Sequence, residues 1–516
     1  MKPDWNRTYS RLLEARLPPA SGVKQRLEGI DDIDALIAQA ALMGISGQLT
    51  TQKLDALTAA MSGNGPLVVS GRQFGRTIAP LTPRELAPPA RLHGLPEYDL
   101  SLFDTAASDV DTALEITFDI TGNSTTEGRK EDIQAFFNYR FQRLRSMIIR
   151  KGLPNRQISI SELLSQRRAY QGYGRSATII GMVNDPKHTK NGHFVFVLED
   201  EGGEVDCICY RDEDNPNPII KTGLMQDDVI AVTGNLGDDR DVLRIDEFHR
   251  PPLNQHHRNS AEQGVSVAFI SDIHVGSKTF LEAQWMKMVD WFASDPLART
   301  IKYLILSGDV VDGVGIYPNQ DRELAISDLF GQYSRFAELL ELLPDWVECL
   351  LLPGNHDAVR PAEPQPALDP EIQQDFNSTT FVGNPCSFEL HGVSLLSYHG
   401  KSIDDFVGLP TVDYGNPVEA MREMLRRRHL APTWGSKTPL SPEPEDNMII
   451  SEIPDIFVTG HVHGHACLDF KGTTLVCSST WQDQTAYQRM LGFQPKPCIL
   501  TVINLKTHAT ASIPFA

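Results

Sequence analysis

The chain has 516 residues, a formal net charge of −20 at pH 7 and 41% hydrophobic residues. A chain of this length exceeds what one hydrophobic core usually organises, so we expect about two to four domains. The negative charge argues against a protein that grips DNA unaided, because the phosphate backbone rewards positive charge. DNA would reach such a protein along a local basic path, or a partner protein would present the DNA to it.

The sequence also argues against a membrane or secreted protein. Its longest apolar windows, such as Val347 to Leu352, are far shorter than a membrane span, and its first residues lack the apolar core of a signal peptide. The seven cysteines form neither a C-x-x-C motif nor a disulfide framework, which indicates small buried residues in a reducing compartment. We therefore expect a cytoplasmic protein without membrane contact.

Residues 1–63 are predicted to form a small helical domain. Apolar residues recur at helical spacing between Ile30 and Met61, with an interruption at Gly44 to Gly47. Asp31 and Asp32 are candidate N-caps for the first of these helices. The alternative is a solvated helical hairpin that packs on nothing else.

Residues 64–129 are rich in Pro, Thr and Asp. A segment of this composition cannot bury enough apolar surface to offset its ordering entropy, so we expect a linker that is largely disordered. Within it, Ala113 to Ile120 alternates apolar and polar residues as a strand does.

Residues 130–250 are predicted to combine a basic helix with a β-barrel. The segment from Glu131 to Lys151 has a helical pattern, becomes basic toward its end and carries interleaved aromatic residues, so it could face DNA; packing on the next domain is the interpretation we prefer. Between residues 175 and 250, five apolar runs separated by Gly, Asn and Asp turns, with a helical link around Pro218 to Thr222, fit an OB-fold. The five runs are Ala177 to Val183, Phe194 to Leu198, Val205 to Tyr210, Val229 to Thr233 and Val242 to Ile245.

Acidic side chains crowd the predicted strands of this barrel, among them Glu199, Asp200, Glu201 and Asp206. An OB-fold that binds single strands would present aromatic and basic residues instead. We therefore expect the barrel to have a structural or subunit-docking role.

Residues 264–516 repeat one pattern five times. In each case a short, nearly continuous apolar run, of the length expected for a strand buried on both faces, ends in Asp, Asn or His. Side chains at neighbouring strand ends of one sheet can converge on one point, and helices are predicted between the strands. The runs are Val265 to Ile270, Tyr303 to Leu306, Val347 to Leu352, Val393 to Leu396 and Ile456 to Val458, and the helices are Trp285 to Phe292, Ser327 to Leu342 and Pro417 to His429.

The residues at these strand ends give seven candidate metal ligands. All offer oxygen or nitrogen, so the set suits Mn, Fe or Zn, whereas oxygen ligands alone would favour Mg or Ca. Seven ligands exceed what one tetrahedral ion needs, and we infer two ions ~3.5–4 Å apart with one bridging carboxylate, a centre that supports in-line attack on phosphorus. Each short motif alone has a high false-positive rate, but five in this order predict a metal site. The ligands are Asp272, His274, Asp309, Asn355, His399, His461 and His463.

These motifs also carry a family resemblance. Asp-x-His, Gly-Asp-x-x-Asp, Gly-Asn-His-Asp, a later His and Gly-His-x-His form a signature similar to that of the calcineurin-like metallophosphoesterases. The flanking segments Ala362 to Pro366, Tyr398 to Asp405 and Thr480 to Thr485 resemble the small exonuclease subunits of archaeal family D DNA polymerases. The resemblance covers Arg175 to Ala516. It implies a multidomain α+β chain, with an OB-fold followed by an α/β/β/α calcineurin-like sandwich at residues 264–516.

The resemblance implies roles for individual residues. Asp309 would bridge the two metals, and His356 would act as general acid on the scissile phosphate. Asp312 would orient His356 and raise its pKa, although a solvated turn residue is the alternative. Beside these ligands, Asp357 is expected to accept a backbone or His hydrogen bond, His465 to lie next to the ligands or at the surface, and Asp404 and Asp405 to be candidate partners of metal-bound histidines. The first metal would be held by Asp272, His274 and His463, and the second by Asn355, His399 and His461.

The function that follows from the resemblance is a 3′→5′ exonuclease that proofreads for a large catalytic polymerase subunit in DNA replication. Its cofactors would be two divalent ions, Mn²⁺ first, with Fe, Zn or Mg as alternatives. Its partners would be that large subunit and single-stranded or mismatched DNA 3′ ends, with a sliding clamp as a further candidate, and it would work at the nucleoid. Two alternatives are a phosphomonoesterase or cyclic-nucleotide phosphodiesterase with the same site, and a mainly structural accessory subunit.

Overall fold

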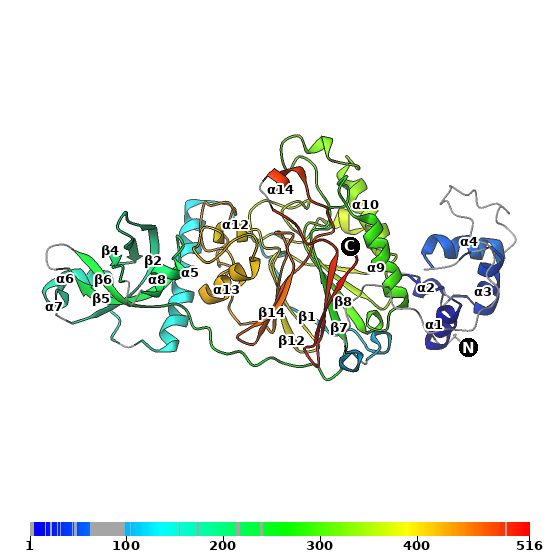
Figure 1. The fold of residues 1–516 in the computed structure, drawn as a ribbon, viewed down its shortest axis with the longest axis horizontal. Coiled ribbons are helices and arrows are strands. Elements are labelled where there is room, and N and C mark those ends of the chain that lie inside the picture. The colour runs from blue at the N-terminus through cyan, green and yellow to red at the C-terminus, as the bar shows by residue number, and fades with distance from the viewer. Residues whose placement is uncertain are drawn as a thin grey trace.

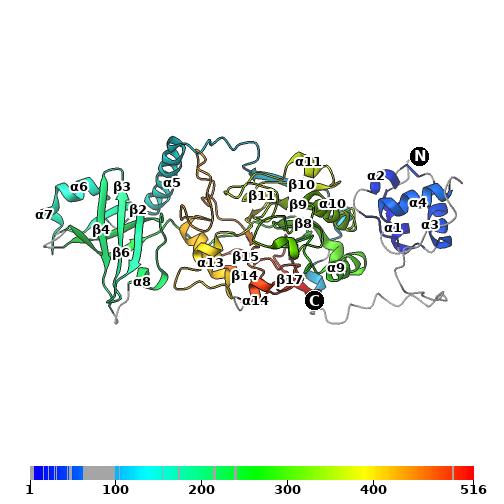
Figure 2. The same ribbon diagram turned by 90° about the horizontal axis from the view of Figure 1, so that it is seen from above.

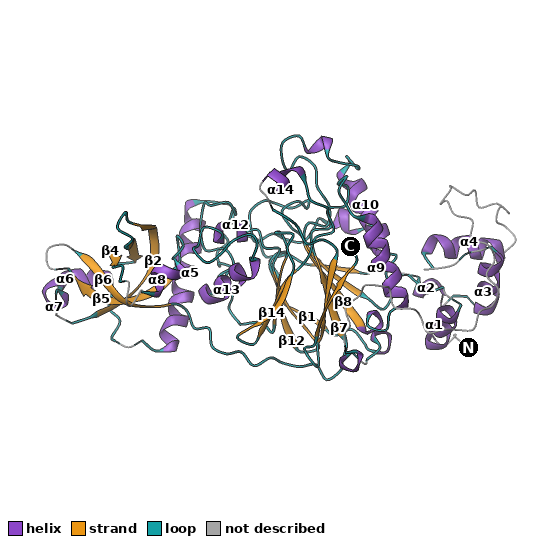
Figure 3. Cartoon of the chain, in the orientation of Figure 1, coloured by secondary structure: helices purple, strands orange, loops and turns teal. Residues whose placement is uncertain are grey.

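The computed structural model describes residues 5–516, apart from residues 16, 21–22, 28, 31, 44, 46–48, 62–98, 104, 154, 173–174, 213–216, 238–240 and 491–492. Three units follow one another along the long axis: a group of short helices, a body with two large sheets, and a closed barrel (Figure 1, Figure 2). The multidomain α+β class is therefore confirmed (Figure 3). The domain limits themselves stay predictions.

The N-terminal unit consists of the helices α1 (Trp5–Glu14), α2 (Lys24–Leu27), α3 (Ile33–Leu42) and α4 (Thr51–Met61). Asp32 caps α3 as predicted, because its Oδ1 accepts a hydrogen bond from the backbone N of Ala35 at 2.9 Å; Asp31 lies outside the described residues. The helices pack around one apolar core. The ring of Tyr9 meets that of Trp346 edge-on at 5.4 Å, so this unit contacts the body.

The expectation of a disordered linker is wrong for the described part of residues 99–129. After η1 (Leu100–Leu102) and η2 (Ala107–Asp109), the strand β1 (Leu114–Phe118) pairs antiparallel with β11 (Cys386–Leu390) of the body. The strand predicted within Ala113 to Ile120 is thus confirmed, while residues 62–98 lie outside the described residues. The composition of the segment does not reveal this strand. The strand is stabilised by pairing with the edge of the sheet at β11, and β11 lies far away in the sequence.

A closed five-stranded barrel follows, with the strand order β2-β3-β4-β6-β5. Each of the five predicted runs forms one of its strands, and the helical link is α8 (Pro218–Thr222). Two short helices, α6 (Ile160–Ser165) and α7 (Arg167–Tyr170), lie beside the barrel (Figure 1). The strands are β2 (Ala177–His188), β3 (Phe194–Asp200), β4 (Gly203–Cys209), β5 (Val229–Leu236) and β6 (Val242–His249).

The predicted basic helix, α5 (Lys130–Lys151), joins the barrel to the body. Its apolar residues Leu144 and Ile148 share a core with Val229 and Ala231 of β5. On the body side, Arg140 is fully buried, and its Nε lies 2.5 Å from Oδ2 of Asp446. The centre of this helix therefore packs between two units, which agrees with the packing interpretation and not with a DNA-facing surface.

The body contains two six-stranded sheets. One has the order β10-β9-β8-β7-β16-β17, and the other has the order β1-β11-β12-β13-β15-β14. The strands of the first are β7 (Ser266–Ile270), β8 (Ile301–Ser307), β9 (Glu348–Leu352), β10 (Thr379–Phe381), β16 (Ile499–Asn504) and β17 (Thr510–Pro514). The second adds β12 (Val393–Ser397), β13 (Ile456–Thr459), β14 (Ala466–Phe470) and β15 (Thr473–Cys477) to β1 and β11.

Helices cover the outer faces of both sheets. The three predicted helices form α9 (Glu282–Ser294), α10 (Leu329–Leu340) and α13 (Pro417–Arg427). In β7, Ala268 and Ile270 pack with α9 and α10, whereas Val267 and Phe269 face the other sheet. The outer face of the second sheet packs on α12 (Ile403–Phe406) and α13. The layers are therefore helix, sheet, sheet, helix. Shorter elements are η3 (Ala298–Thr300), η4 (Gln320–Arg322), α11 (Pro370–Gln373) and α14 (Ala486–Met490).

Within the described ranges, no helix combines the length and the apolar character that crossing a membrane requires.

Candidate metal centre

The seven candidate ligands lie where five parallel strands end, and they come from two sheets. Strands β7, β8 and β9 of one sheet lead to Asp272, His274, Asp309 and Asn355, while β12 and β13 of the other lead to His399, His461 and His463. The ligands therefore come from strand ends of both layers of the sandwich and not from neighbouring strands of one sheet alone. The two sheets pack face to face, so that the carboxyl ends of both sets of strands meet at one edge of the body.

Five of these residues have a left-handed backbone. The φ angle is 53° at Asp272, 54° at His274, 53° at Asp309, 67° at His461 and 50° at His463. Such a conformation costs roughly 1–3 kcal/mol for a residue with a side chain, and it persists where the surrounding structure enforces it, often at functional sites. The gathering of five such residues at one edge of the body therefore makes this edge a candidate functional site.

Glycines in the same motifs let the chain approach the ligands closely. A Cβ atom at Gly354 would lie 2.2 Å from Oδ1 of Asp309, and one at Gly460 would lie 2.6 Å from Oδ2 of Asp272. Both distances are far below van der Waals contact, so a larger residue at either position would displace a ligand. The glycines are thus part of the geometry of the site.

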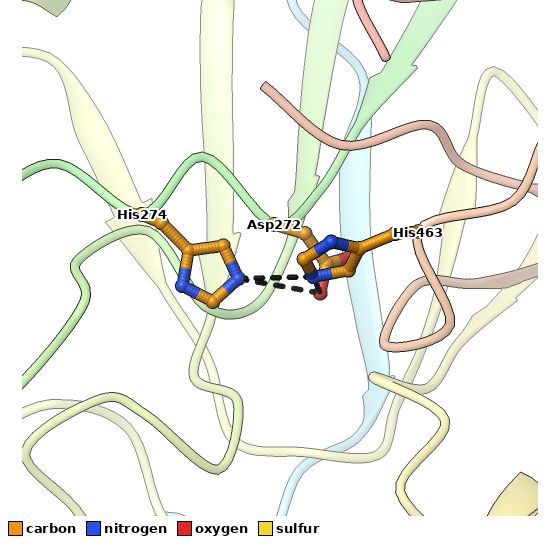
Figure 4. Close-up of side chains that lie close together, drawn as sticks. All are labelled: Asp272, His274 and His463. Atoms are coloured by element: carbon orange, nitrogen blue, oxygen red, sulfur yellow. Dashed lines mark hydrogen bonds and ion pairs between the residues drawn. The ribbon is translucent and has the colours of Figure 1, made fainter. Parts of the chain in front are cut away.

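Asp272, His274 and His463 form the first ligand group (Figure 4). Nε2 of His274 lies 3.1 Å from Nε2 of His463, and Oδ1 of Asp272 lies 3.5 Å from Nε2 of His463. All three residues are buried, and among the described residues none donates a hydrogen bond to this Oδ1. A buried carboxylate oxygen without a donor, faced by two imidazole nitrogens, fits a cation.

Asp309, His399 and His461 form the second group, which Asn355 joins. Oδ2 of Asp309 lies 3.3 Å from Nε2 of His399, and Oδ1 of Asn355 lies 3.1 Å from the same nitrogen. Ligand atoms of Asp309, His399 and His461 lie within 4.8 Å of one another, and Asp309 forms a similar set with His274 and His356. Asp309 therefore lies between the two groups, where a bridging carboxylate would be.

The ligand histidines of the second sheet are each held at their other ring nitrogen. Nδ1 of His399 donates to the carbonyl that ends β8 at 2.8 Å. Nε2 of His461 lies 3.3 Å from Oδ2 of Asp404, and Nδ1 of His463 lies 2.9 Å from the side-chain amide of Gln488. Partners of this kind fix the ring orientation and so determine which nitrogen faces a metal.

The electrostatics of the site favour cations. Burial alone would raise the pKa of Asp309, but the charges of His399 and His356 hold it well below its usual value. Burial alone would lower the pKa of His399, yet Asp309 raises it to about 10. For His274 and His461, burial lowers the pKa, which favours the neutral imidazole that binds metals. The second group therefore attracts positive charge, as a proton or as a metal ion.

The structure corrects the predicted role of Asp312. Its carboxylate does not contact His356; instead Oδ1 lies 3.3 Å from Nδ1 of His274, and the carboxylate accepts hydrogen bonds from Gln320 and Gln482 at 2.9 and 3.1 Å. The backbone carbonyl of Asp312 accepts Nδ1–H of His356 at 2.8 Å. Sequence spacing places Asp312 beside His356 but does not reveal the direction of its side chain. The solvated-turn alternative is also wrong, because Asp312 is buried.

The neighbours of the ligands have hydrogen-bond partners of their own: Asp404 contacts the ligand His461 as expected, whereas Asp405 accepts from the backbone N of Lys437 at 2.9 Å. Asp357 accepts hydrogen bonds from the backbone N of Gly354 at 2.8 Å and from the hydroxyl of Tyr333 at 3.1 Å. Nε2 of His465 lies 3.0 Å from Oγ1 of Thr501.

Three glutamines at the site were missed. Gln482 belongs to a segment that the family resemblance singled out, but its side chain received no role, and nothing in the sequence marks Gln320 or Gln488 as neighbours of the ligands. A glutamine contact depends on the fold of distant loops and carries no motif of its own.

Comparison with known proteins places the chain in a family. The family of the B subunits of DNA polymerases alpha and epsilon matches residues 267–467, a range that contains all seven candidate ligands. The chain is 38% identical to the DNA polymerase II small subunit of Halobacterium salinarum over 401 residues, which cover 77% of each protein. With the DNA polymerase II small subunit of Archaeoglobus fulgidus it shares 37% identity over 436 residues, which are 82% of this chain and 84% of the relative. The chain therefore belongs to the family of archaeal DNA polymerase II small subunits.

Proposed function

We propose that this chain is a metal-dependent 3′→5′ exonuclease that proofreads for a DNA polymerase, in a complex with a large catalytic subunit. The observation that carries the proposal is the convergence of all seven candidate ligands, with His356 beside them, in a chain whose relatives are DNA polymerase subunits. A subunit with a purely structural role would have no reason to keep five strained ligand residues around a buried cluster of charges.

The proposal extends to the fold. The helix, sheet, sheet, helix layers support a calcineurin-like sandwich for the body, and the closed barrel with its strand order supports an OB-fold. The acidic strands of the barrel favour contact with the large subunit over contact with single-stranded DNA.

The residues present fit two divalent cations, for which Mn²⁺ is our first candidate and Fe, Zn or Mg are alternatives. When bound, such ions act as Lewis acids on a phosphodiester and lower the pKa of water. The first ion would be held by Asp272, His274 and His463, and the second by Asn355, His399 and His461, with Asp309 between them.

His356 would supply the proton that the leaving oxygen needs. The carbonyl of Asp312 can only accept a hydrogen bond, so Nδ1 of His356 carries a hydrogen and Nε2 is the atom that exchanges a proton. The rings of His356 and His274 lie 4.7 Å apart, which places His356 at the rim of the ligand cluster. As water attacks phosphorus and the P–O3′ bond breaks, the Nε2 proton would pass to O3′ of the shortened strand, and a 5′-mononucleotide would leave.

The test is a time course on a 5′-labelled single-stranded oligonucleotide with Mn²⁺ and with EDTA, beside p-nitrophenyl phosphate and a cyclic nucleotide. We expect stepwise shortening from the 3′ end that EDTA abolishes. His463→Ala should remove this activity, while His465→Ala, a change two residues away and outside the ligand set, should retain it. Hydrolysis of the small phosphoesters without shortening of DNA would overturn the proposal in favour of a phosphomonoesterase or cyclic-nucleotide phosphodiesterase.

A further inference from the structure

A loop beside His356 holds apolar side chains in solvent. The loop follows Asp312 and spans residues 313–319; Val314 is 48% exposed and Ile316 is 41% exposed. The ring of Tyr317 in the same loop lies 6.4 Å from that of His356. Scattered exposed apolar residues are common on proteins, but two in one short loop at the rim of the ligand cluster require an explanation.

The loop is fixed at its base by buried side chains. Gln332 is fully buried; its Oε1 accepts from the backbone N of Gly313 at 2.9 Å, and its Nε2 donates to the Gly313 carbonyl at 3.2 Å. Gln320, also buried, accepts from the backbone N of Ile316 at 2.9 Å and donates to the carbonyl of Asp312 at 2.8 Å. The loop is therefore held in place by polar contacts at its base, while Val314 and Ile316 leave nearly half of their surface exposed to solvent.

We propose that Val314, Ile316 and Tyr317, here named the apolar loop, contact the nucleobase of the penultimate nucleotide at a DNA 3′ end. The inference rests on the proposed function, which places O3′ of that nucleotide next to Nε2 of His356. The base attached to the same sugar then lies beside the apolar loop. Flat base faces stack on aromatic rings, and aliphatic side chains such as Ile can wedge between neighbouring bases.

This contact would select unpaired ends. A base in a duplex is covered on its faces by its neighbours, whereas the last bases of a frayed or mismatched end can leave the stack at low cost. Because the apolar loop is already held in place, a base that binds to it does not have to offset the loss of conformational entropy that ordering a flexible loop would require. The apolar loop thus gives the site a preference for single-stranded 3′ ends that the ligands alone would not provide.

The test compares three 5′-labelled single strands: an intact one, one with an abasic site at the penultimate position and one with an abasic site at the terminal position. The rate of the first cleavage is measured at limiting substrate with Mn²⁺. We expect the wild-type chain to cleave the intact strand about tenfold faster than the penultimate-abasic strand. Ile316→Ser and Tyr317→Ala should lower cleavage of the intact strand to the rate of the penultimate-abasic strand and should not slow the latter further.

Two control variants separate this contact from general effects. Ile149→Ser removes an isoleucine that is 44% exposed on α5, far from the site, and should leave all three rates unchanged. Tyr317→Phe removes the hydroxyl that donates to Glu323 at 3.1 Å but keeps the ring, so the preference for the intact strand should remain. A readout without catalysis is the fluorescence of 2-aminopurine at the penultimate position in EDTA, which the wild-type chain should quench by stacking on Tyr317 and Tyr317→Ala should not.

The two proposals fail in different ways. If the wild-type chain shortens no strand from its 3′ end, the exonuclease function is wrong and the inference falls with it. If the wild-type chain shortens all strands but treats the intact and penultimate-abasic strands alike, only the inference is overturned. Equal slowing of all three strands by Ile316→Ser, or loss of binding to the large subunit with unchanged rate ratios, would also overturn it.

Discussion

The carboxylate of Asp312 lies 3.3 Å from Nδ1 of His274, on the opposite side of the ring from the other ligands. Both side chains are buried, and in a medium of low dielectric constant the electrostatic attraction between a carboxylate and an imidazole nitrogen this close is strong. Burial also lowers the pKa of His274, which favours the neutral ring; Nδ1 faces Asp312 and Nε2 faces the ligand cluster. The Asp312 carboxylate therefore supports the proposed metal ligand His274, while the backbone carbonyl of Asp312 orients His356.

Asp312→Asn should weaken Mn²⁺ binding by about 10- to 100-fold, which is the usual effect of removing a residue that supports a metal-binding histidine. At saturating Mn²⁺ the turnover should stay near that of the wild type, because the backbone contact to His356 is unchanged. Titration calorimetry with Mn²⁺ and rates at increasing Mn²⁺ measure the two effects. Unchanged affinity with a large loss of turnover would show that the carboxylate takes part in proton transfer.

His356→Ala should leave the metal content unchanged and slow turnover by ~10² to 10⁴-fold, the range for a missing general acid.

Asp309→Ala is the counterpart of this variant and should lose at least one ion, because this buried carboxylate lies between both ligand groups. Elemental analysis of the purified variants distinguishes them. If Asp309→Ala kept both ions and near-normal turnover, Asp309 would not be the bridging residue.

The sequence predicts the strands well, and it predicts that the candidate ligands lie at the ends of these strands, because both features follow local rules. Apolar runs such as Val265 to Ile270 form strands where predicted, since a strand buried on both faces needs continuous apolar residues. Features that depend on distant partners could not be predicted. The polar segment around β1 is ordered because β11 pairs with it, and the side chain of Asp312 points to His274 because Gln320 and Gln482 approach it from other loops.

Glu363 should make the stability of the metal-free chain depend on pH. Burial raises its pKa to about 7, although the hydroxyl of Tyr398 donates a hydrogen bond to it at 2.7 Å. Because this pKa is higher in the folded than in the unfolded state, the contribution of Glu363 to the free energy of unfolding is fully present below the ordinary pKa of 4.5. It is lost as the pH rises through about 7. Glu363→Gln should remove this component, which is at most roughly 3 kcal/mol of the free energy of unfolding.

Urea unfolding of the wild type and Glu363→Gln at pH 5 and pH 8, both without metal, measures this difference. The variant should gain stability relative to the wild type as the pH rises. The control is Glu131→Gln, which changes an exposed carboxyl on α5 and should leave the pH dependence as it is. The same pH dependence in Glu363→Gln and wild type would contradict the prediction.

Arg140→Ala should destabilise the junction between the barrel and the body by about 3–5 kcal/mol, because it leaves the buried Asp446 without its cation. Arg140 also lies over the ring of Phe136, so packing is lost with the charge. Thermal unfolding and limited proteolysis near α5 should both reveal the change. Arg150→Ala, at the exposed end of the same helix, should have little effect, because Ala is at least as good a helix former as Arg. Equal destabilisation by both variants would show that the buried ion pair is not responsible.

The large subunit should increase both the rate and the selectivity of 3′ end removal. The net charge of −20 predicts weak DNA binding by the chain alone, since few phosphates can be neutralised and little counterion is released. A polymerase subunit that holds the primer would raise the local concentration of its 3′ end at the metal centre. A duplex in B form does not present its terminal linkage to a buried cluster, so mismatched ends, which fray, should be cleaved faster than matched ones. A time course on matched and mismatched primers, with and without the large subunit, measures both effects. Digestion from the 5′ end, or equal rates on matched and mismatched ends in the complex, would rule out proofreading even if the chain proved to be a metal-dependent phosphodiesterase.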